Sequence, residues 1–209
     1  MTSSLDDPAG GFVLALEGST QVASCAIRDP AGLVTELAMP AGIRHVEGLP
    51  ALVEEAASRS RVELRDLGLV VVGSGPGSYM GIRATVAVAN TLSYVAHCPI
   101  AEISTLDSLG LEVAGRDRDA LVAIAAGRGR FFVAAYRVLD GVVERVREPE
   151  LVEGEHLHGG ADVAVHGLDD NHHPTARGHL AAIGKRPEWL NVREVAGAQP
   201  RYGPSGRET

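Results

Sequence analysis

The sequence has little cysteine, few aromatic residues and no excess of positive charge. Its 209 residues include two cysteines, Cys25 and Cys98, and both lie in apolar stretches. We therefore expect buried free thiols in a reducing compartment rather than a secreted disulfide scaffold. Aromatic residues make up 4% of the chain and the formal net charge is -8. This composition argues against a protein that grips nucleic acid by itself, since it offers few stacking platforms and no general attraction to phosphate.

Long apolar runs are also missing. No run approaches the roughly 18 to 20 residues that a membrane-spanning helix needs. The first residues, MTSSLDDPAGG, are acidic where a secretory signal is basic. We therefore expect a soluble protein of the cytoplasm, without a membrane partner.

The residues that are present predict an α/β protein. FVLALEGST, QVASCAIRD and LVTELAMP are short apolar runs separated by turn signals, which predicts a three-stranded meander. Helical spacing predicts an amphipathic helix over 45–59, and the β-branched run LGLVVVGSG predicts a central buried strand. A nearly uncharged helix is expected over 79–96.

The second half repeats this theme more weakly. CPIAEIST and LDSLGLEVAG predict a strand and a helix, and ALVAIAA, RFFVAAYRVLD and VVERVREP predict a second meander. In the tail from His156, rich in Gly, His, Asp and Pro, only TARGHLAAIG predicts a helix. The repetition suggests two related lobes, which we place at 1–108 and 109–209.

The segment GSGPGSYMGIRATVAVAN, residues 73–90, has two interpretations. Glycines between a strand and a helix let backbone N–H groups converge on an anion at the helix N-terminus. The spacing fits neither a Walker A loop nor a dinucleotide fingerprint, so a tight turn that delivers the helix to a partner is the alternative. Ser78 is expected to cap this helix rather than act as a nucleophile, because the Gly-x-Ser-x-Gly frame is absent.

The same segment, extended to GSGPGSYMGIRATVAVANTLSYVAHCPIAEISTLDSL, resembles the signature region of the bacterial TsaB family. LALEGST, RHVEGLPALVEE, GRGRFFVAAY and AQPRYGPSG resemble further family motifs in the same order, so the resemblance covers most of residues 12–204. The chain departs from the family pattern at polar positions. These are Glu17, Gly18, Val46, Met80 and Ala126.

The resemblance implies an actin-like (sugar kinase/Hsp70/actin) two-lobe fold, each lobe a mixed β-sheet with flanking helices. It implies a non-catalytic subunit that supports a TsaD-like paralogue and a TsaE-like ATPase in making threonylcarbamoyladenosine in tRNA. It also implies a homodimer when the chain is alone, contact with tRNA only through the partner, and no cofactor. The runner-up is an actin-like enzyme, a kinase or carbamoyl-type transferase, that uses ATP and magnesium in the cleft between the lobes.

Two sets of site residues follow, and no catalytic residue is expected. For the partner interface on the helices at 45–59 and 79–96 we expect His45, Leu49, Leu52, Tyr79, Ile82, Arg83, Val86, Ala89 and Asn90. For a vestigial nucleotide loop we expect Glu17, Ser19, Gly75, Gly77 and Ser78. No metal site is expected, because the histidines of HLH and NHHP lack metal-ligand spacing.

Overall fold

The computed structural model describes residues 11–39, 48–113, 119–157, 164–166, 173–193 and 195–202. It contains a six-stranded and a four-stranded sheet. The strands are β1 (Phe12–Glu17), β2 (Ala23–Arg28), β3 (Val34–Met39), β4 (Leu67–Gly73), β5 (Ile100–Ile103), β6 (Asp119–Gly127), β7 (Arg130–Leu139), β8 (Val142–Glu153), β9 (Ala164–His166) and β10 (Asn191–Arg193). The helices are α1 (Leu49–Ser60), α2 (Tyr79–Ala96), α3 (Thr105–Val113) and α4 (Ala176–Lys185).

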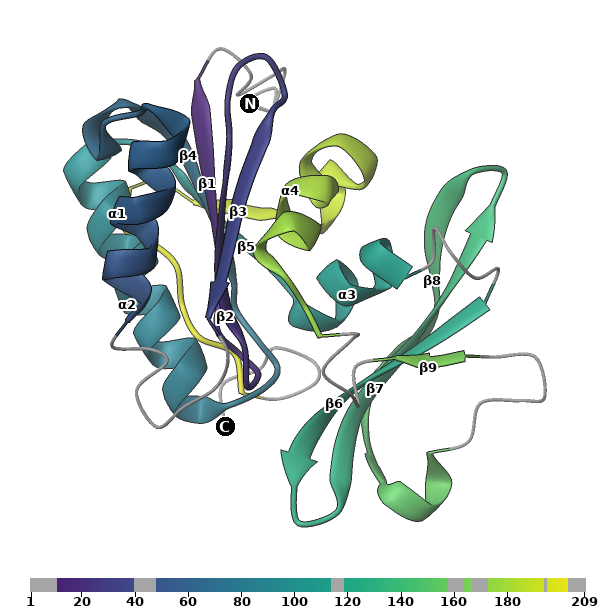
Figure 1. Cartoon of the computed structure of the whole chain (residues 1–209). Coiled ribbons are helices and arrows are strands. Elements are labelled where there is room, and N and C mark those ends of the chain that lie inside the picture. The colour runs from purple at the N-terminus through teal and green to yellow at the C-terminus, as the bar shows by residue number, and fades with distance from the viewer. Residues whose placement is uncertain are drawn as a thin grey trace.

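The first sheet has the strand order β10-β5-β4-β1-β2-β3. β1, β2 and β3 form the expected antiparallel meander, and β4 lies parallel to both β1 and β5. The central buried strand and the helix over 79–96 are therefore confirmed. In Figure 1, α1 and α2 cover one face of this sheet, while α4 and α3 lie on the other side, toward the second sheet.

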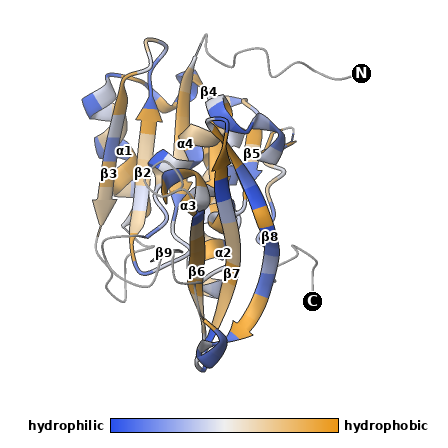
Figure 2. Cartoon of the chain, turned by 90° about the vertical axis from the view of Figure 1, so that its right-hand side faces the viewer, coloured by the Kyte–Doolittle hydropathy of each residue, from blue (hydrophilic) through white to orange (hydrophobic). Residues whose placement is uncertain are grey.

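Alternate residues of the central strands serve two separate cores. Leu14 and Val70 face α1 and α2, whereas Val13 and Leu69 face the side of α3, α4 and the second sheet. Burial on both faces explains why β1 and β4 are apolar throughout rather than alternating with polar residues. Figure 2 shows β4 mostly in the hydrophobic colour.

The end of the chain returns to the first sheet. β10 pairs antiparallel with β5, and α4 packs against β1, β2 and β4. The helix expected in the tail is confirmed as α4, and the short strands β9 and β10 are further elements there. Each has three residues, too few to show a periodic pattern. The division at residues 108 and 109 stays a prediction, and the topology adds that the first sheet takes elements from both parts.

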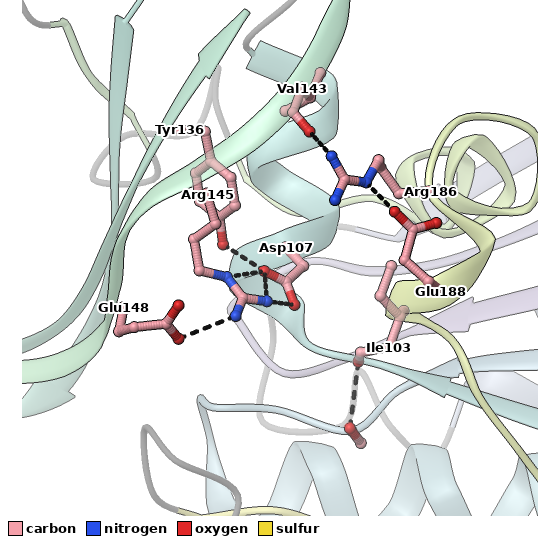
Figure 3. Close-up of polar contacts among 9 residues, drawn as sticks. Ile103, Asp107, Tyr136, Val143, Arg145, Glu148, Arg186 and Glu188 are labelled. Carbon is pink, nitrogen blue, oxygen red and sulfur yellow. Dashed lines mark hydrogen bonds and ion pairs between the residues drawn. The ribbon is translucent and has the colours of Figure 1, made fainter. Parts of the chain in front are cut away.

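A buried ion pair attaches α3 to the second sheet (Figure 3). Asp107, near the start of α3, is 4% exposed, and both its oxygens accept hydrogen bonds of 2.6 Å from Nη2 of Arg145 on β8. The hydroxyl of Tyr136 on β7 donates to the same carboxylate at 2.7 Å. The guanidinium of Arg145 also lies 5.4 Å from the centroid of the Trp189 ring.

Both cysteines, Cys25 and Cys98, are buried and free, as expected. No described helix combines the length and apolar character needed to cross a membrane.

Candidate functional site

The glycines of the loop after β4 are in contact with the protein's own backbone. Gly75 has a φ of +103°, and a Cβ there would lie 2.3 Å from the carbonyl oxygen of Arg201. A Cβ on Gly77 would lie 2.2 Å from the carbonyl oxygen of Ser19. The N–H of Ser78 donates to that same oxygen at 2.6 Å. Glycine is therefore required here because the loop packs against neighbouring main chain.

The first turn of α2 is fixed in the same way. Ser78 caps the helix, as expected, by accepting a hydrogen bond of 3.3 Å from the N–H of Gly81. A Cβ on Gly81 would lie 2.0 Å from the carbonyl oxygen of Gly18. Thr85 donates to the carbonyl of Gly81 at 2.9 Å. Helix α2 thus lies directly on the turn that follows β1.

Glu17, the acidic residue at the end of β1, is fully buried. Its Oε2 lies 2.9 Å from Nε2 of His179 on α4, and Nδ1 of His179 lies 2.6 Å from the hydroxyl of Ser108 on α3. The N–H of Ser19 also donates to the carboxylate. Burial alone raises the pKa of Glu17, but the contacts with His179 and Ser19 outweigh burial and lower it.

This arrangement does not fit a magnesium nucleotide. In an actin-like enzyme the carboxylate of the first hairpin is expected to organise metal and water beside the phosphates. Here the Glu17 carboxylate is enclosed and directed at an imidazole, and the glycine loop is backed by the main chain of Ser19 and Arg201. Among the described residues, no three histidine, cysteine, aspartate or glutamate side chains form a metal-binding group.

The segment 195–202 runs along α2 and the glycine loop. Glu102 on β5, 1% exposed, accepts hydrogen bonds from Arg193 Nε at 2.8 Å and from the Gln199 N–H at 2.9 Å. Nη2 of Arg201 donates to its other oxygen at 3.1 Å. The ring of Tyr202 then lies 4.6 Å from that of Tyr79. The sequence analysis identified AQPRYGPSG only as a family motif and did not predict these contacts, although an acid inside the apolar strand IAEI signals that a basic partner is needed.

The structure places the expected interface residues in different environments. His45 lies outside the described residues. Asn90 is engaged with the chain itself, since its amide donates to and accepts from the backbone of Ala198 at 3.0 Å. Tyr79 and Arg83 are exposed. Five others are 0 to 8% exposed and form the core beneath the helices: Leu49, Leu52, Ile82, Val86 and Ala89.

The solvent side of α2 carries a different set of apolar residues. We call Tyr79, Met80, Tyr94 and Val95 the outer face of α2; they are 51%, 68%, 65% and 52% exposed. Arg83 is the one charged residue of the helix, and its Nη1 donates to the Tyr79 hydroxyl at 2.7 Å. These side chains form two pairs, one at each end of α2, with Arg83, Ala87 and Thr91 exposed between them. Exposed apolar side chains of this size are typical of a protein contact surface.

The neighbouring helix α1 lacks such exposed apolar side chains. The solvent side of α1 includes Glu54, Glu55 and Arg59, all exposed, and Arg59 pairs with Glu55. An exposed helix face of this kind is ordinary for a protein surface. Of the two helices on this side of the first sheet, α2 therefore has the more apolar exposed side.

Comparisons with known proteins agree with this architecture. A family model described as "TsaD: tRNA N6-adenosine threonylcarbamoyltransferase" matches residues 22–167. The solved structure of YeaZ from Pseudomonas aeruginosa superposes with a TM-score of 0.80 at 20% identity, covering 92% of this chain and 99% of that one. The chain therefore has the expected actin-like two-lobe fold.

Several curated proteins are similar over part of their length. The tRNA threonylcarbamoyladenosine biosynthesis protein TsaB of Bacillus subtilis is 37% identical over 84 residues, which cover 39% of this chain and 36% of that protein. TsaB of Escherichia coli is 29% identical over 67% of this chain and 64% of its own length. An uncharacterized protein of Mycobacterium tuberculosis is 31% identical over 61% of this chain and 57% of its own length. The matches thus span about a third to two thirds of these relatives.

Proposed function

Because the chain belongs to the TsaD family, as a divergent member of its TsaB branch, we propose that it serves tRNA threonylcarbamoyladenosine biosynthesis as a non-catalytic subunit. Its partner is a TsaD-like paralogue that performs the transfer in the cytoplasm. The observation that carries this proposal is the outer face of α2, where four large apolar or aromatic side chains lie exposed on a helix with one charge.

The position of Glu17 and the negative net charge favour a non-catalytic role for this chain. The carboxylate of the first hairpin, Glu17, is enclosed against His179, so it is not free to organise a metal. The net charge of -8 disfavours direct contact with tRNA, because a polyanion is repelled by a protein of the same sign. Contact with tRNA therefore goes through the paralogue.

The interface is proposed to lie on the outer face of α2, with Arg83 at its polar end. The buried residues Ile82, Val86 and Ala89 hold α2 on the sheet. They contribute to the interface only by keeping the helix in position. A TsaE-like ATPase joins the paralogue in the complete assembly. When the chain is alone, a second copy covers the same apolar surface as a homodimer.

Reconstitution tests this role. Purified chain is combined with the TsaD-like paralogue, the TsaE-like ATPase and the adenylate-forming enzyme, and threonylcarbamoyladenosine is measured in tRNA that reads codons beginning with adenosine. The test variant is Met80→Glu with Val95→Lys. These charges agree with the dipole of α2, so the helix itself is preserved. We expect at least about a tenfold loss of modification, since charges buried at an apolar interface remain unpaired.

The control is Leu139→Glu. Leu139 is 44% exposed at the end of β7, in the second sheet, so it matches the apolar-to-charged change at a different surface. Its modification level should equal that of the wild type. The proposal is wrong if the complex modifies tRNA equally well without this chain, or if the double variant supports full modification.

A further inference from the structure

The segment 195–202 follows α2 from its last turn back to the glycine loop that precedes its first turn. The N–H of Ala196 donates to the hydroxyl of Ser93, in the last turn of α2, at 3.0 Å. The N–H of Arg201 donates to the carbonyl of Ser74, in the glycine loop, at 2.7 Å. Figure 1 shows this yellow segment passing beside α2. Its end is therefore held at the N-terminal end of α2.

Three side chains meet at this end of the helix: Tyr79, Arg83 and Tyr202, which we call the aromatic corner. The centroids of the Tyr79 and Tyr202 rings lie 4.6 Å apart. Nη1 of Arg83 donates to the Tyr79 hydroxyl at 2.7 Å, and the guanidinium carbon lies 5.3 Å from the centroid of the same ring. The guanidinium of Arg83 is therefore held in one orientation by the chain itself.

The charge of the aromatic corner is not compensated by the chain. The first turn of α2 contains no acidic residue, although an acid there would be favoured by the helix dipole. The nearby acid Glu102 is taken by Arg193 and Arg201. Among the described residues, no carboxylate forms an ion pair with Arg83. This end of α2 is therefore positive, on a chain whose net charge is -8.

We propose that the aromatic corner binds a carboxylate side chain of the TsaD-like paralogue, an inference that rests on the proposed function. The aspartate or glutamate of the paralogue accepts hydrogen bonds from the remaining N–H groups of Arg83. The rings of Tyr79 and Tyr202 shield this ion pair from water. Because the guanidinium is already oriented, it loses little side-chain entropy on binding. Arginine and tyrosine are also the residue types that often dominate the energy of protein interfaces.

The outer face of α2 on a second copy of the chain does not supply this carboxylate. A two-fold homodimer brings the same surface of both copies together, and α2 carries Arg83 but no acidic residue. In such a contact the guanidinium meets a helix with an arginine of its own. An unpaired charge at an interface disfavours that partner, so Arg83 favours the paralogue over self-association through α2.

Titration calorimetry of the full chain with the TsaD-like paralogue, at two salt concentrations, tests the aromatic corner. Arg83→Gln removes the charge and should bind about tenfold more weakly at about 0.05 M salt, because interfacial ion pairs contribute to affinity. At about 0.5 M salt, where the ion pair is screened, this loss should shrink to about threefold or less. Tyr202→Ala should also weaken binding, whereas Tyr202→Phe, which keeps the ring beside Tyr79, should bind like the wild type.

Arg128→Gln is the matched control. Arg128 is exposed in the turn between β6 and β7, so this variant removes the same charge at a different surface and should bind like the wild type. Arg83 is exposed too, so both variants should keep the wild-type melting temperature. Wild-type affinity of Arg83→Gln, or an equal loss at both salt concentrations, would overturn the proposal. The docking surface itself is wrong only if Met80→Glu/Val95→Lys also binds like the wild type.

Discussion

Replacing Gly81 with alanine is expected to lower the free energy of unfolding by about 2 kcal/mol. The new methyl group would lie 2.0 Å from the carbonyl oxygen of Gly18, and forced overpacking of this kind costs up to about 3 kcal/mol. The higher helix propensity of alanine returns about 1 kcal/mol. For a chain of this length, the net loss lowers the melting temperature by about 4 to 8 °C, which calorimetry measures.

The control for this substitution is Gly184→Ala in α4. Gly184 is also helical, but no atom lies within 4 Å of the place that its Cβ would occupy. Only the higher helix propensity of alanine then acts, so the free energy of unfolding of this variant should rise by about 0.5 to 1 kcal/mol. If the glycines of the loop instead served a phosphate, Gly81→Ala would be as harmless to stability as Gly184→Ala. Equal melting temperatures for the two variants would therefore contradict the packing role.

Replacing Asp107 with alanine is expected to cost about 3 kcal/mol. The substitution leaves the Arg145 guanidinium and the Tyr136 hydroxyl without their shared acceptor, and removing one partner of a buried ion pair costs about 3 to 5 kcal/mol. We expect the lower end because the Arg145 side chain is 24% exposed and also contacts Glu148. Denaturant unfolding followed through the fluorescence of Trp189, the one tryptophan of the chain, measures the loss.

Asp119→Ala is the matched control for Asp107→Ala. Asp119 also forms a two-point contact with an arginine, Arg137, at 2.6 and 2.9 Å. That pair lies at the surface, where salt bridges contribute little because water screens them. No resolvable change in stability is expected. A similar decrease in the free energy of unfolding for both variants would contradict the claim that burial makes the Asp107–Arg145 pair the more stabilising one.

Much of the fold follows from local patterns in the sequence. The alternation of apolar runs and turn signals predicts β1, β2 and β3, and the bounds of α2 agree with the expected helix over 79–96. Ser78 was predictable as the cap because a hydroxyl before an apolar helix has few other roles. These features depend on neighbours in the chain, which is why sequence reasoning reaches them.

The orientation of α2 was not predictable from its own residues. With one charge in eighteen residues, the helix gives only a weak sign of its solvent face, and the sequence analysis therefore places the inward-facing Ile82, Val86 and Ala89 among the expected interface residues. The outward positions include Met80 and Val95. A helix such as α1, with several charges on its exposed side, carries its orientation in the sequence, whereas the orientation of a helix with a single charge depends more on the sheet on which it packs.

The buried polar contacts escaped prediction for a different reason. Glu17 meets His179 and Glu102 meets Arg193, and in each pair the partners are far apart in the sequence. A histidine inside the apolar helix TARGHLAAIG signals only that some polar partner is near. Its identity depends on the return of α4 to the first sheet, which no local pattern shows.

The most direct test of the account is the affinity of this chain for its TsaD-like paralogue, measured by titration calorimetry with the wild type, with Met80→Glu/Val95→Lys and with Leu139→Glu. If the outer face of α2 is the docking surface, the double variant binds at least about 100-fold more weakly, because an apolar contact at each end of the helix becomes an unpaired buried charge. The Leu139 variant binds like the wild type. Equal affinity of the folded double variant and the wild type would contradict the account.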